Sequence, residues 1–259
     1  MNIYQVDTFT SNTLSGNPAA VIPLDNWLPD NLLQKIAREN NLSETVFFVP
    51  VGEDFHIRWF TPTVEVALCG HATLASAYIL KTELGYSKDE ITFKTNTKGD
   101  LKVNINDDLY TLDFPKETFE EVSSYPEELV SGLGVAPEKV FKGIDYVVIL
   151  KNEEDVKAVQ PDLSIIKSID TRGVVISAPG DQVDFVSRFF SPQNGIDEDP
   201  VTGSAHCLLA PIWQQLLSKS ELSAQQVSTQ LGHLNCQVGE SRVYISGKAA
   251  LYIKGEIFI

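Results

Sequence analysis

The 259-residue sequence has few cysteines and no long apolar run. Its three cysteines, Cys69, Cys207 and Cys236, are widely spaced and form no CxxC pair, so we expect reduced thiols rather than disulfides. No stretch approaches the ~20 apolar residues of a membrane-spanning helix, and no basic segment followed by an apolar run stands at the start. These absences predict a cytoplasmic protein without a membrane partner.

Positive charge is also scarce. The sequence has 20 lysines and arginines against 35 aspartates and glutamates, which gives a net charge of −15. This balance argues against a nucleic-acid partner held by general electrostatic attraction. It leaves a small anionic substrate open, because a few local amides or cations override a distant field. With 43% hydrophobic residues, the chain is expected to bury an ordinary core without metals or disulfides.

The sequence contains an internal repeat. RWFTP begins at Arg58 and RFFSP begins at Arg188, 130 residues further on. Each block is followed by an acidic stretch, a glycine-containing turn and a segment rich in alanine and leucine. The shared order predicts two homologous halves, which we place at residues 1–117 and 118–259. The acidic, proline-bounded segment 115–129 is the expected connection, and the last strand is free to return to the first half.

Two segments are apolar on every side. Residues 71–84 and 203–217 have almost no polar stripe at helical spacing, which predicts two helices buried all round. Strand-like segments such as TVFFVP and VVISA occur in both halves and supply the sheet that such helices need. A further, amphipathic helix is predicted at 28–40, with Pro29 in its first turn. The predicted fold class is α+β, with two pseudo-symmetric domains, each a barrel-like sheet around a central buried helix.

Four short stretches carry candidate chemistry: SGNPAAVI (15–22), NNLSETVFF (40–48), ALCGHATLA (67–75) and EDPVTGSAH (198–206). If each glycine turn opens a helix, its unpaired amides and the helix dipole favour a bound carboxylate. In the alternative interpretation Thr202 and Ser204 are N-caps and Gly70 relieves a tight turn, with no ligand involved. The presence of two equivalent turns in a repeat favours the site.

Titratable residues lie beside these turns. His71 and Asp199 suit a general acid and base, or groups that orient a substrate. Alternatively, Asp199 begins an Asx turn and His71 bonds a backbone carbonyl. Glu44 is flanked by apolar residues, so desolvation would raise its pKa and let it hold a proton near neutral pH. The alternative is a solvated, inert carboxylate.

A metal site is not predicted. Cys69 and His71 are separated by one residue, which is too tight for the usual zinc spacings. His206 and Cys207 are adjacent on a predicted helix, where neighbouring side chains diverge by about 100°.

The four stretches occur together in one known family. SGNPAAV, NLSET, RWFTPTVEVALCGHATLA and RFFSPQNGIDEDPVTGSAH follow one another along the whole chain. In this order they resemble the PhzF-like phenazine biosynthesis family, which has the diaminopimelate epimerase-like fold. The resemblance implies two pseudo-symmetric domains with the active site in the cleft between them, and it implies an isomerase without a cofactor.

The resemblance also implies residue roles. Glu44 would move a proton between carbons of a small unsaturated or amino carboxylic acid, and His71 and Asp199 would orient the substrate and assist. The substrate-binding residues would be Asn17, Gly70, Thr202, Gly203 and Ser204. A non-catalytic protein that binds small carboxylates on the same fold is the alternative function, and a metal enzyme is a third. A homodimer is the commonest assembly and is the expectation here.

Epimerases of this fold use two cysteines, one in each glycine turn. In this chain Cys69 matches the first, while we assign the second position to Pro200. Because proline neither gives nor takes a proton, the sequence argues against a two-thiol racemase. Cys69 is then expected to be a small packing residue.

Overall fold

The computed structural model describes all 259 residues, which form a sheet-dominated α+β fold with few helices, as predicted. The chain divides into two compact units. Unit 1 comprises Met1–Asp113 and Ser246–Ile259, and unit 2 comprises Phe114–Ile245. The predicted division after residue 117 falls slightly later than this one, and the last strand belongs to unit 1.

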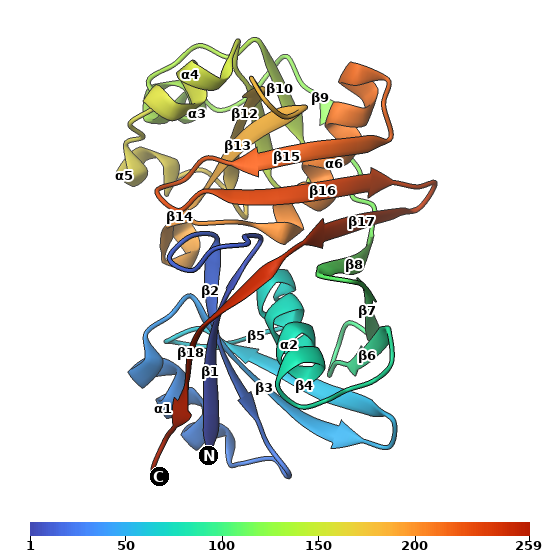
Figure 1. The fold of residues 1–259 in the computed structure, drawn as a ribbon. Helices are drawn as coiled ribbons and strands as arrows, with labels where there is room; N and C mark the ends of the chain where they lie inside the picture. Colours follow the sequence, from blue (N-terminus) through green and yellow to red (C-terminus); the bar gives the residue numbers. More distant parts are fainter. The chain divides into compact units, whose positions relative to one another are not determined.

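In unit 1, strands surround one central helix, α2 (Figure 1). Strand β1 is antiparallel to both β2 and β18, so the first and last strands of the chain lie side by side. The elements of unit 1 are β1 (Asn2–Thr8), β2 (Asn17–Pro23), α1 (Asp30–Asn40), β3 (Glu44–Val51), β4 (Asp54–Phe60), β5 (Glu65–Val66), α2 (Gly70–Thr82), β6 (Glu90–Lys94), β7 (Asp100–Asn106), β8 (Leu109–Pro115, which runs on into unit 2) and β18 (Ala249–Glu256).

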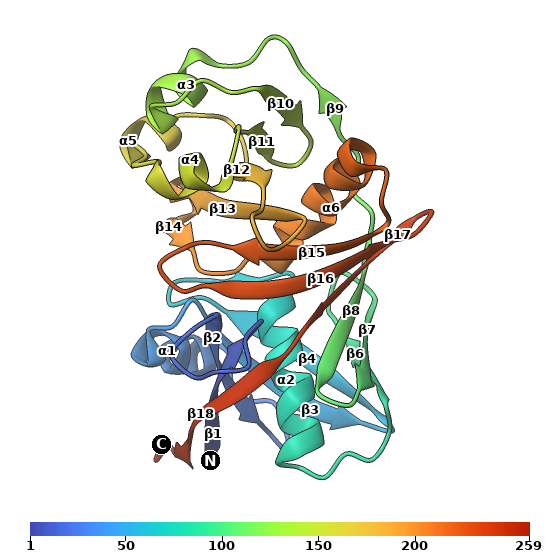
Figure 2. The same ribbon diagram turned by 45° about the horizontal axis from the view of Figure 1, so that its top comes forward.

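Unit 2 repeats this plan around α6, which lies against β15 and β16 (Figure 2). Its elements are β9 (Glu120–Glu121), α3 (Glu127–Leu133), β10 (Lys139–Lys142), β11 (Tyr146–Ile149), α4 (Glu153–Ala158), α5 (Leu163–Ile166), β12 (Val174–Pro179), β13 (Phe185–Ser191), the 3-10 helix η1 (Pro192–Asn194), β14 (Ile196–Asp199), α6 (Gly203–Leu217), β15 (Glu221–Gln226), β16 (Gly232–Val238) and β17 (Arg242–Gly247, which returns to unit 1).

Strand pairing confirms the internal repeat. In unit 1, β2 is parallel to β3, β3 is antiparallel to β4, and β4 is antiparallel to β5 and parallel to β6. In unit 2, β11 is parallel to β12, β12 is antiparallel to β13, and β13 is antiparallel to β14 and parallel to β15. The repeated arginines occupy equivalent places, since Arg58 lies in β4 and Arg188 lies in β13. Each also forms a two-pronged pair with a glutamate of the next strand, Glu65 or Glu198.

Both central helices are buried on nearly every side, as predicted. Residues Gly70 to Ala77 of α2 are all buried, and so are Ala205 to Trp213 of α6. The many alanines leave room for strands to approach from several directions.

Helix α6 contains a proline at position 211. Proline lacks an N–H group, so the carbonyl of Cys207 loses its helical partner. The backbone N–H of Glu117 donates to this carbonyl instead, at 3.3 Å. The segment that enters unit 2 after β8 is thereby attached to the central helix.

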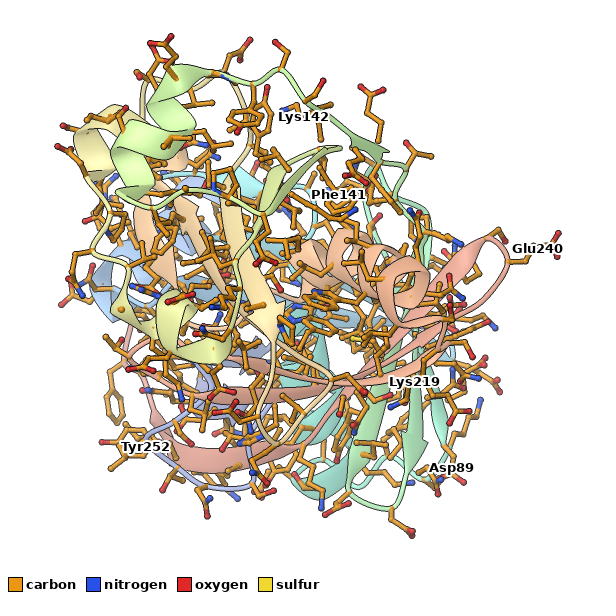
Figure 3. The ribbon with its side chains drawn as sticks, turned by 90° about the horizontal axis from the view of Figure 1, so that it is seen from above. Asp89, Phe141, Lys142, Lys219, Glu240 and Tyr252 are labelled. Carbon is orange, nitrogen blue, oxygen red and sulfur yellow. The ribbon has the colours of Figure 1, made fainter.

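The surface elements differ more from prediction. Helix α1 is present, but Pro29 occupies the N-cap position before its first residue rather than the first turn. Strands β14, β15 and β16 and helices α3, α4 and α5 were not predicted. Charged side chains such as Asp89, Lys219 and Glu240 lie at the periphery (Figure 3). Every helix is too short or too polar to cross a lipid bilayer.

Candidate active site

In unit 1, three elements begin at one edge of the sheet. Because helix α1 connects β2 to β3 as parallel neighbours, both strands start at the same edge, with Glu44 opposite Ala19. Asn17 is the first residue of β2, Glu44 is the first residue of β3, and His71 is the second residue of α2. The fold thus gathers three of the predicted site residues into one cluster.

Glu44 is the most perturbed group of this cluster. The residue is 9% exposed, and burial raises the pKa of its carboxyl group to about 7. Hydrogen bonds from Ser43 and Cys69 oppose this rise without cancelling it. One carboxylate oxygen, Oε2, lies 3.3 Å from Nε2 of His71. Glu44 is therefore not solvated, as the alternative interpretation required.

The hydrogen bonds around His71 assign its tautomer. The side-chain nitrogen Nδ2 of Asn17 lies 3.4 Å from Nδ1 of His71, and the side-chain oxygen of Asn17 accepts from the Ser43 hydroxyl at 3.2 Å. The Asn17 nitrogen can only donate, so Nδ1 accepts and the neutral ring carries its proton on Nε2. That proton faces the carboxylate of Glu44.

Cys69 occupies the N-cap position of α2, and its side chain makes no capping bond. Its sulfur lies 3.4 Å from Nδ1 of His71, and it also bonds the Glu44 carboxyl group. Our expectation of a mere packing residue is thus incomplete, because the thiol belongs to the Glu44 cluster.

Glu44, Cys69 and His71 offer a carboxylate oxygen, a sulfur and a ring nitrogen within 4.8 Å of one another. One metal ion would need all three donors to converge on one point. The three groups instead contact one another: the thiol lies 3.4 Å from Nδ1 of His71 and bonds the Glu44 carboxyl group, whose Oε2 lies 3.3 Å from Nε2 of the same ring. This arrangement fits a hydrogen-bonded set better than a single ion.

In unit 2, Asp199 ends β14 and Thr202 occupies the N-cap position of α6. The Thr202 hydroxyl donates to Oδ2 of Asp199 at 2.5 Å rather than capping the helix. The Gln226 side chain accepts from the Thr202 backbone N–H at 2.8 Å and donates to the Asp199 carbonyl at 2.7 Å. Gln226 is only 1% exposed, so these bonds fix the turn from both sides. Thr202 thus occupies the N-cap position, but the predicted capping by its side chain is wrong.

Gly203 and Ser204 begin α6, where amide groups and the helix dipole favour negative charge. The Ser204 hydroxyl accepts from Nη1 of Arg172 at 2.8 Å, so Ser204 is not an N-cap either. Arg172 is itself paired with Asp145, which is fully buried.

The structural match between the two helix starts corrects one assignment. Cys69-Gly70-His71 opens α2, and Thr202-Gly203-Ser204 opens α6. The residue equivalent to Cys69 is therefore Thr202 and not Pro200. An alcohol of unit 2 therefore stands where unit 1 has the Cys69 thiol.

The remaining histidine and cysteine of the metal interpretation lie inside α6. Nδ1 of His206 bonds the Thr202 carbonyl at 2.8 Å, and the sulfur of Cys207 points to the Gly203 carbonyl at 3.8 Å. Burial lowers the pKa of His206 to about 4 and raises the pKa of Cys207 to about 12. Both groups are neutral at pH 7 and bonded to their own helix.

Sequence reasoning missed four residues of these clusters: Ser43, Asp145, Arg172 and Gln226. Ser43 lies within the NLSET motif, and Arg172 lies two residues before the strand that corresponds to TVFFVP. A residue-by-residue alignment of the two halves would have pointed to both. Asp145 and Gln226 carry no such signal.

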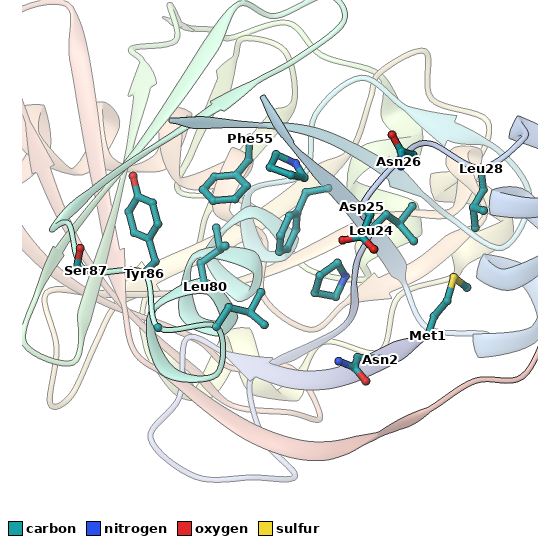
Figure 4. A pocket seen from close by; sticks show the side chains of 15 residues that line it. Met1, Asn2, Leu24, Asp25, Asn26, Leu28, Phe55, Leu80, Tyr86 and Ser87 are labelled. Carbon is teal, nitrogen blue, oxygen red and sulfur yellow. The ribbon is translucent and has the colours of Figure 1, made fainter. Parts of the chain in front are cut away.

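Unit 1 also contains a cavity of about 870 Å³ far from this chemistry (Figure 4). Leu24, Phe55 and Leu80 are among its apolar lining residues, and Asp25 and Ser87 are among the polar ones. Leu80 lies near the end of α2, whereas the Glu44 cluster lies at its start. None of the candidate residues lines this cavity.

The profile of the phenazine biosynthesis-like protein family, PhzC-PhzF, matches residues 6–255. The chain belongs to this family. An uncharacterized isomerase of Pseudomonas aeruginosa is 47% identical over 259 residues, covering 100% of this chain and 99% of the relative. The crystal structure of a PhzF-family protein from Enterococcus faecalis is 44% identical, with a TM-score of 0.97 and coverage of 100% and 99%.

A probable proline racemase from Agrobacterium radiobacter shares the fold alone. Its TM-score is 0.62 at 11% identity, and the match covers 100% of this chain and 93% of that one. The resemblance inferred from the sequence motifs is thus confirmed, as is the fold class. Three bacterial relatives, 47%, 49% and 42% identical, are named isomerases, and this PhzF-family chain is an isomerase.

Proposed function

We propose that this isomerase moves a proton between two carbons of one small unsaturated or amino carboxylic acid, without a cofactor, and that Glu44 carries the proton. The observation that supports this most is the setting of the Glu44 carboxyl group. It is buried, its pKa is about 7, and His71 lies 3.3 Å away. A carboxyl group that titrates near neutral pH can both take and return a proton.

The proton transfer needs two steps. Ionised Glu44 takes a proton from a carbon beside the conjugated system, and the electron pair left behind delocalises into that system. Protonated Glu44 then returns the proton to a different carbon of the same molecule, so nothing is oxidised or reduced. Neutral His71, whose Nε2 lies 3.3 Å from Oε2 of Glu44, would donate to the ionised carboxylate and favour that form before each cycle, with Asn17 beside Nδ1 of the imidazole.

Unit 2 supplies the proposed binding groups. The Gly203 amide and the Ser204 hydroxyl would donate to the substrate carboxylate, as donors at a helix start suit an anion. Asp199 would accept from a hydroxyl or amino group of the substrate. Thr202 holds the Asp199 carboxylate in place, and Gln226 holds the Asp199 backbone carbonyl.

A two-thiol racemase mechanism is not proposed. The position equivalent to Cys69 is Thr202, whose hydroxyl already donates to Asp199. An unactivated alcohol has a pKa far too high to exchange protons with carbon at neutral pH.

Solvent isotope exchange tests the role of Glu44. Small unsaturated and amino carboxylic acids are first screened for thermal stabilisation of the wild-type chain, and the acids that stabilise it are incubated with the protein in D₂O. We expect wild type to incorporate deuterium, and Glu44→Gln to bind the same acids but to exchange them about 1,000-fold more slowly. Deuterium incorporation is read by NMR and mass spectrometry.

Glu153 provides a matched control, because it is another buried glutamate but bonds Lys157 and the Asp181 amide in unit 2. Glu153→Gln should exchange at the wild-type rate. Undiminished exchange in Glu44→Gln would overturn the role of Glu44. Acids that stabilise wild type without exchanging would instead favour the carboxylate-binding protein.

A further inference from the structure

Arg172 lies beside the start of α6 and is held by a buried carboxylate. Asp145 is fully buried and accepts from Nε of Arg172 at 2.9 Å and from Nη2 through its other oxygen. This leaves Nη1 to donate to the Ser204 hydroxyl at 2.8 Å. A two-pronged pair with a buried aspartate fixes the plane of the guanidinium, and so fixes the direction of this third bond.

The repeat shows which residue of unit 2 corresponds to Glu44. Thr45 pairs with Phe60 in unit 1, and Val174 pairs with Phe190 in unit 2. Since Phe60 and Phe190 are equivalent in the two repeated blocks, Val174 corresponds to Thr45. The residue before Val174 is Gly173, which therefore takes the place of Glu44.

At Gly173, the position equivalent to Glu44, unit 2 has no space for a side chain. A Cβ atom added at Gly173 would come within 2.4 Å of the Phe189 ring. The Arg172 guanidinium lies over the same ring, 5.4 Å from its centre. A fixed cation thus stands beside the α6 start, where unit 1 has a proton carrier beside the α2 start.

The Ser204 hydroxyl accepts one hydrogen bond, and its own proton remains available for donation. A guanidinium can only donate, so Ser204 must accept from Arg172. The carbonyl one turn earlier, that of Pro200, already accepts from Ser228 at 2.9 Å. Ser204 makes no hydrogen bond as a donor within the protein, and it is only half-buried.

We infer that Arg172, held by Asp145, is a positioning residue that keeps the Ser204 hydroxyl as a hydrogen-bond donor to the substrate carboxylate. The cation occupies the acceptor side of the hydroxyl and polarises its O–H bond, which strengthens donation to an anion. This inference rests on the proposed function, because it gives Ser204 the role of a carboxylate ligand.

Calorimetric titration of the full chain with anthranilate, and with its uncharged amide as a matched probe, tests the inference. Removing Arg172 alone would strand a buried charge and risk unfolding, so we pair Arg172→Met with Asp145→Asn. We expect this double variant to weaken anthranilate binding about tenfold, as Ser204→Ala does, and the triple variant to lose no more. The amide should lose at most about threefold in each case, because it carries no charge.

The conservative variant Arg172→Lys keeps a donor for Ser204 and should bind anthranilate within about threefold of wild type. Arg58→Met with Glu65→Gln removes the equivalent kind of ion pair in unit 1 and should leave binding unchanged. A merely structural Arg172 predicts losses that multiply with Ser204→Ala and that affect both probes alike.

Three results would overturn the inference: multiplied losses, wild-type affinity in the Arg172→Met/Asp145→Asn variant, or a wild-type chain that does not bind anthranilate. The proposed proton transfer is judged separately by isotope exchange in Glu44→Gln. Non-additive binding without any exchange would support the role of Arg172 while contradicting catalysis by Glu44.

Discussion

The helix starts of α2 and α6 have the same backbone plan and different chemistry. At the start of α2, Glu44, Cys69 and His71 bring together three titratable groups. At the start of α6, the equivalent positions hold Gly173, Thr202 and Ser204, of which none titrates near neutral pH. A duplicated frame has thus kept its geometry while the two copies have acquired different side chains. The comparison supports proton transfer by one unit and anion binding by the other.

The largest expected effect concerns the stability of unit 1. Unfolded Glu44 ionises above its ordinary pKa of 4.5, while folded Glu44 keeps its proton up to about pH 7. Stability is therefore lost as the pH rises from 4.5 to 7, by about 3 kcal/mol. Glu44→Gln does not titrate, so it should gain this amount relative to wild type between pH 4.5 and pH 8. Urea unfolding at both pH values measures the gain, and equal wild-type and variant pH profiles would contradict it.

Unit 2 should show the opposite dependence. Unfolded His206 binds a proton below pH 6.5, while folded His206 stays neutral down to about pH 4. Stability is therefore lost as the pH falls from 6.5 to 4, again by about 3 kcal/mol. His206→Gln keeps a donor for the Thr202 carbonyl and does not titrate. Its urea midpoint should fall less than that of wild type over this range, and a parallel fall would refute the assignment.

Kinetic measurements on an acid that exchanges its proton should distinguish the roles of the two units. His71→Asn should lower kcat for exchange about 100-fold and change KM little, because the residue acts on the proton carrier. Ser204→Ala should raise KM about tenfold and leave kcat within about threefold, because it removes a binding donor. A large kcat effect for Ser204 together with a large KM effect for His71 would reverse the comparison.

The smallest expected effect tests whether the place of Glu44 is closed in unit 2. Gly173→Ala should destabilise the protein by about 2 kcal/mol, because the added Cβ meets the Phe189 ring at 2.4 Å. Gly255→Ala is the control, since an added Cβ there meets no atom within 4 Å. Urea midpoints of the two variants should differ, and equal midpoints would show that Phe189 moves aside freely.

The sequence predicted the elements that are apolar throughout. Long apolar segments must be buried in the core, and this predicts helices α2 and α6 and strands such as β3 and β12. Strand β15, ELSAQQ, was missed because serine, alanine and glutamine have weak strand preference, and only its pairing with β13 and β16 makes it a strand. Strand β14, IDED, is acidic, and the Arg188–Glu198 pair joins it to β13.

Of the site, the sequence predicted the residues that lie within motifs but not the register between the two halves. The offset between equivalent residues is 130 at Arg58 and Arg188 but 133 at Gly70 and Gly203, because the second half has extra residues between its repeated block and its helix. The shift moves the residue equivalent to Cys69 from Asp199, where an offset of 130 would place it, to Thr202. It also hid Arg172 and Asp145, whose contacts depend on how strands and helix pack.

The pairing of β1 with β18 has a consequence for biosynthesis. Asn2 pairs with Glu256, so β1 receives this partner only after the whole of unit 2 has been synthesised. Unit 2, by contrast, is one continuous stretch of chain, from Phe114 to Ile245. During translation unit 2 can complete its own sheet while the edge of β1 that pairs with β18 is still unpaired. A nascent chain would need protection from aggregation at this unpaired edge.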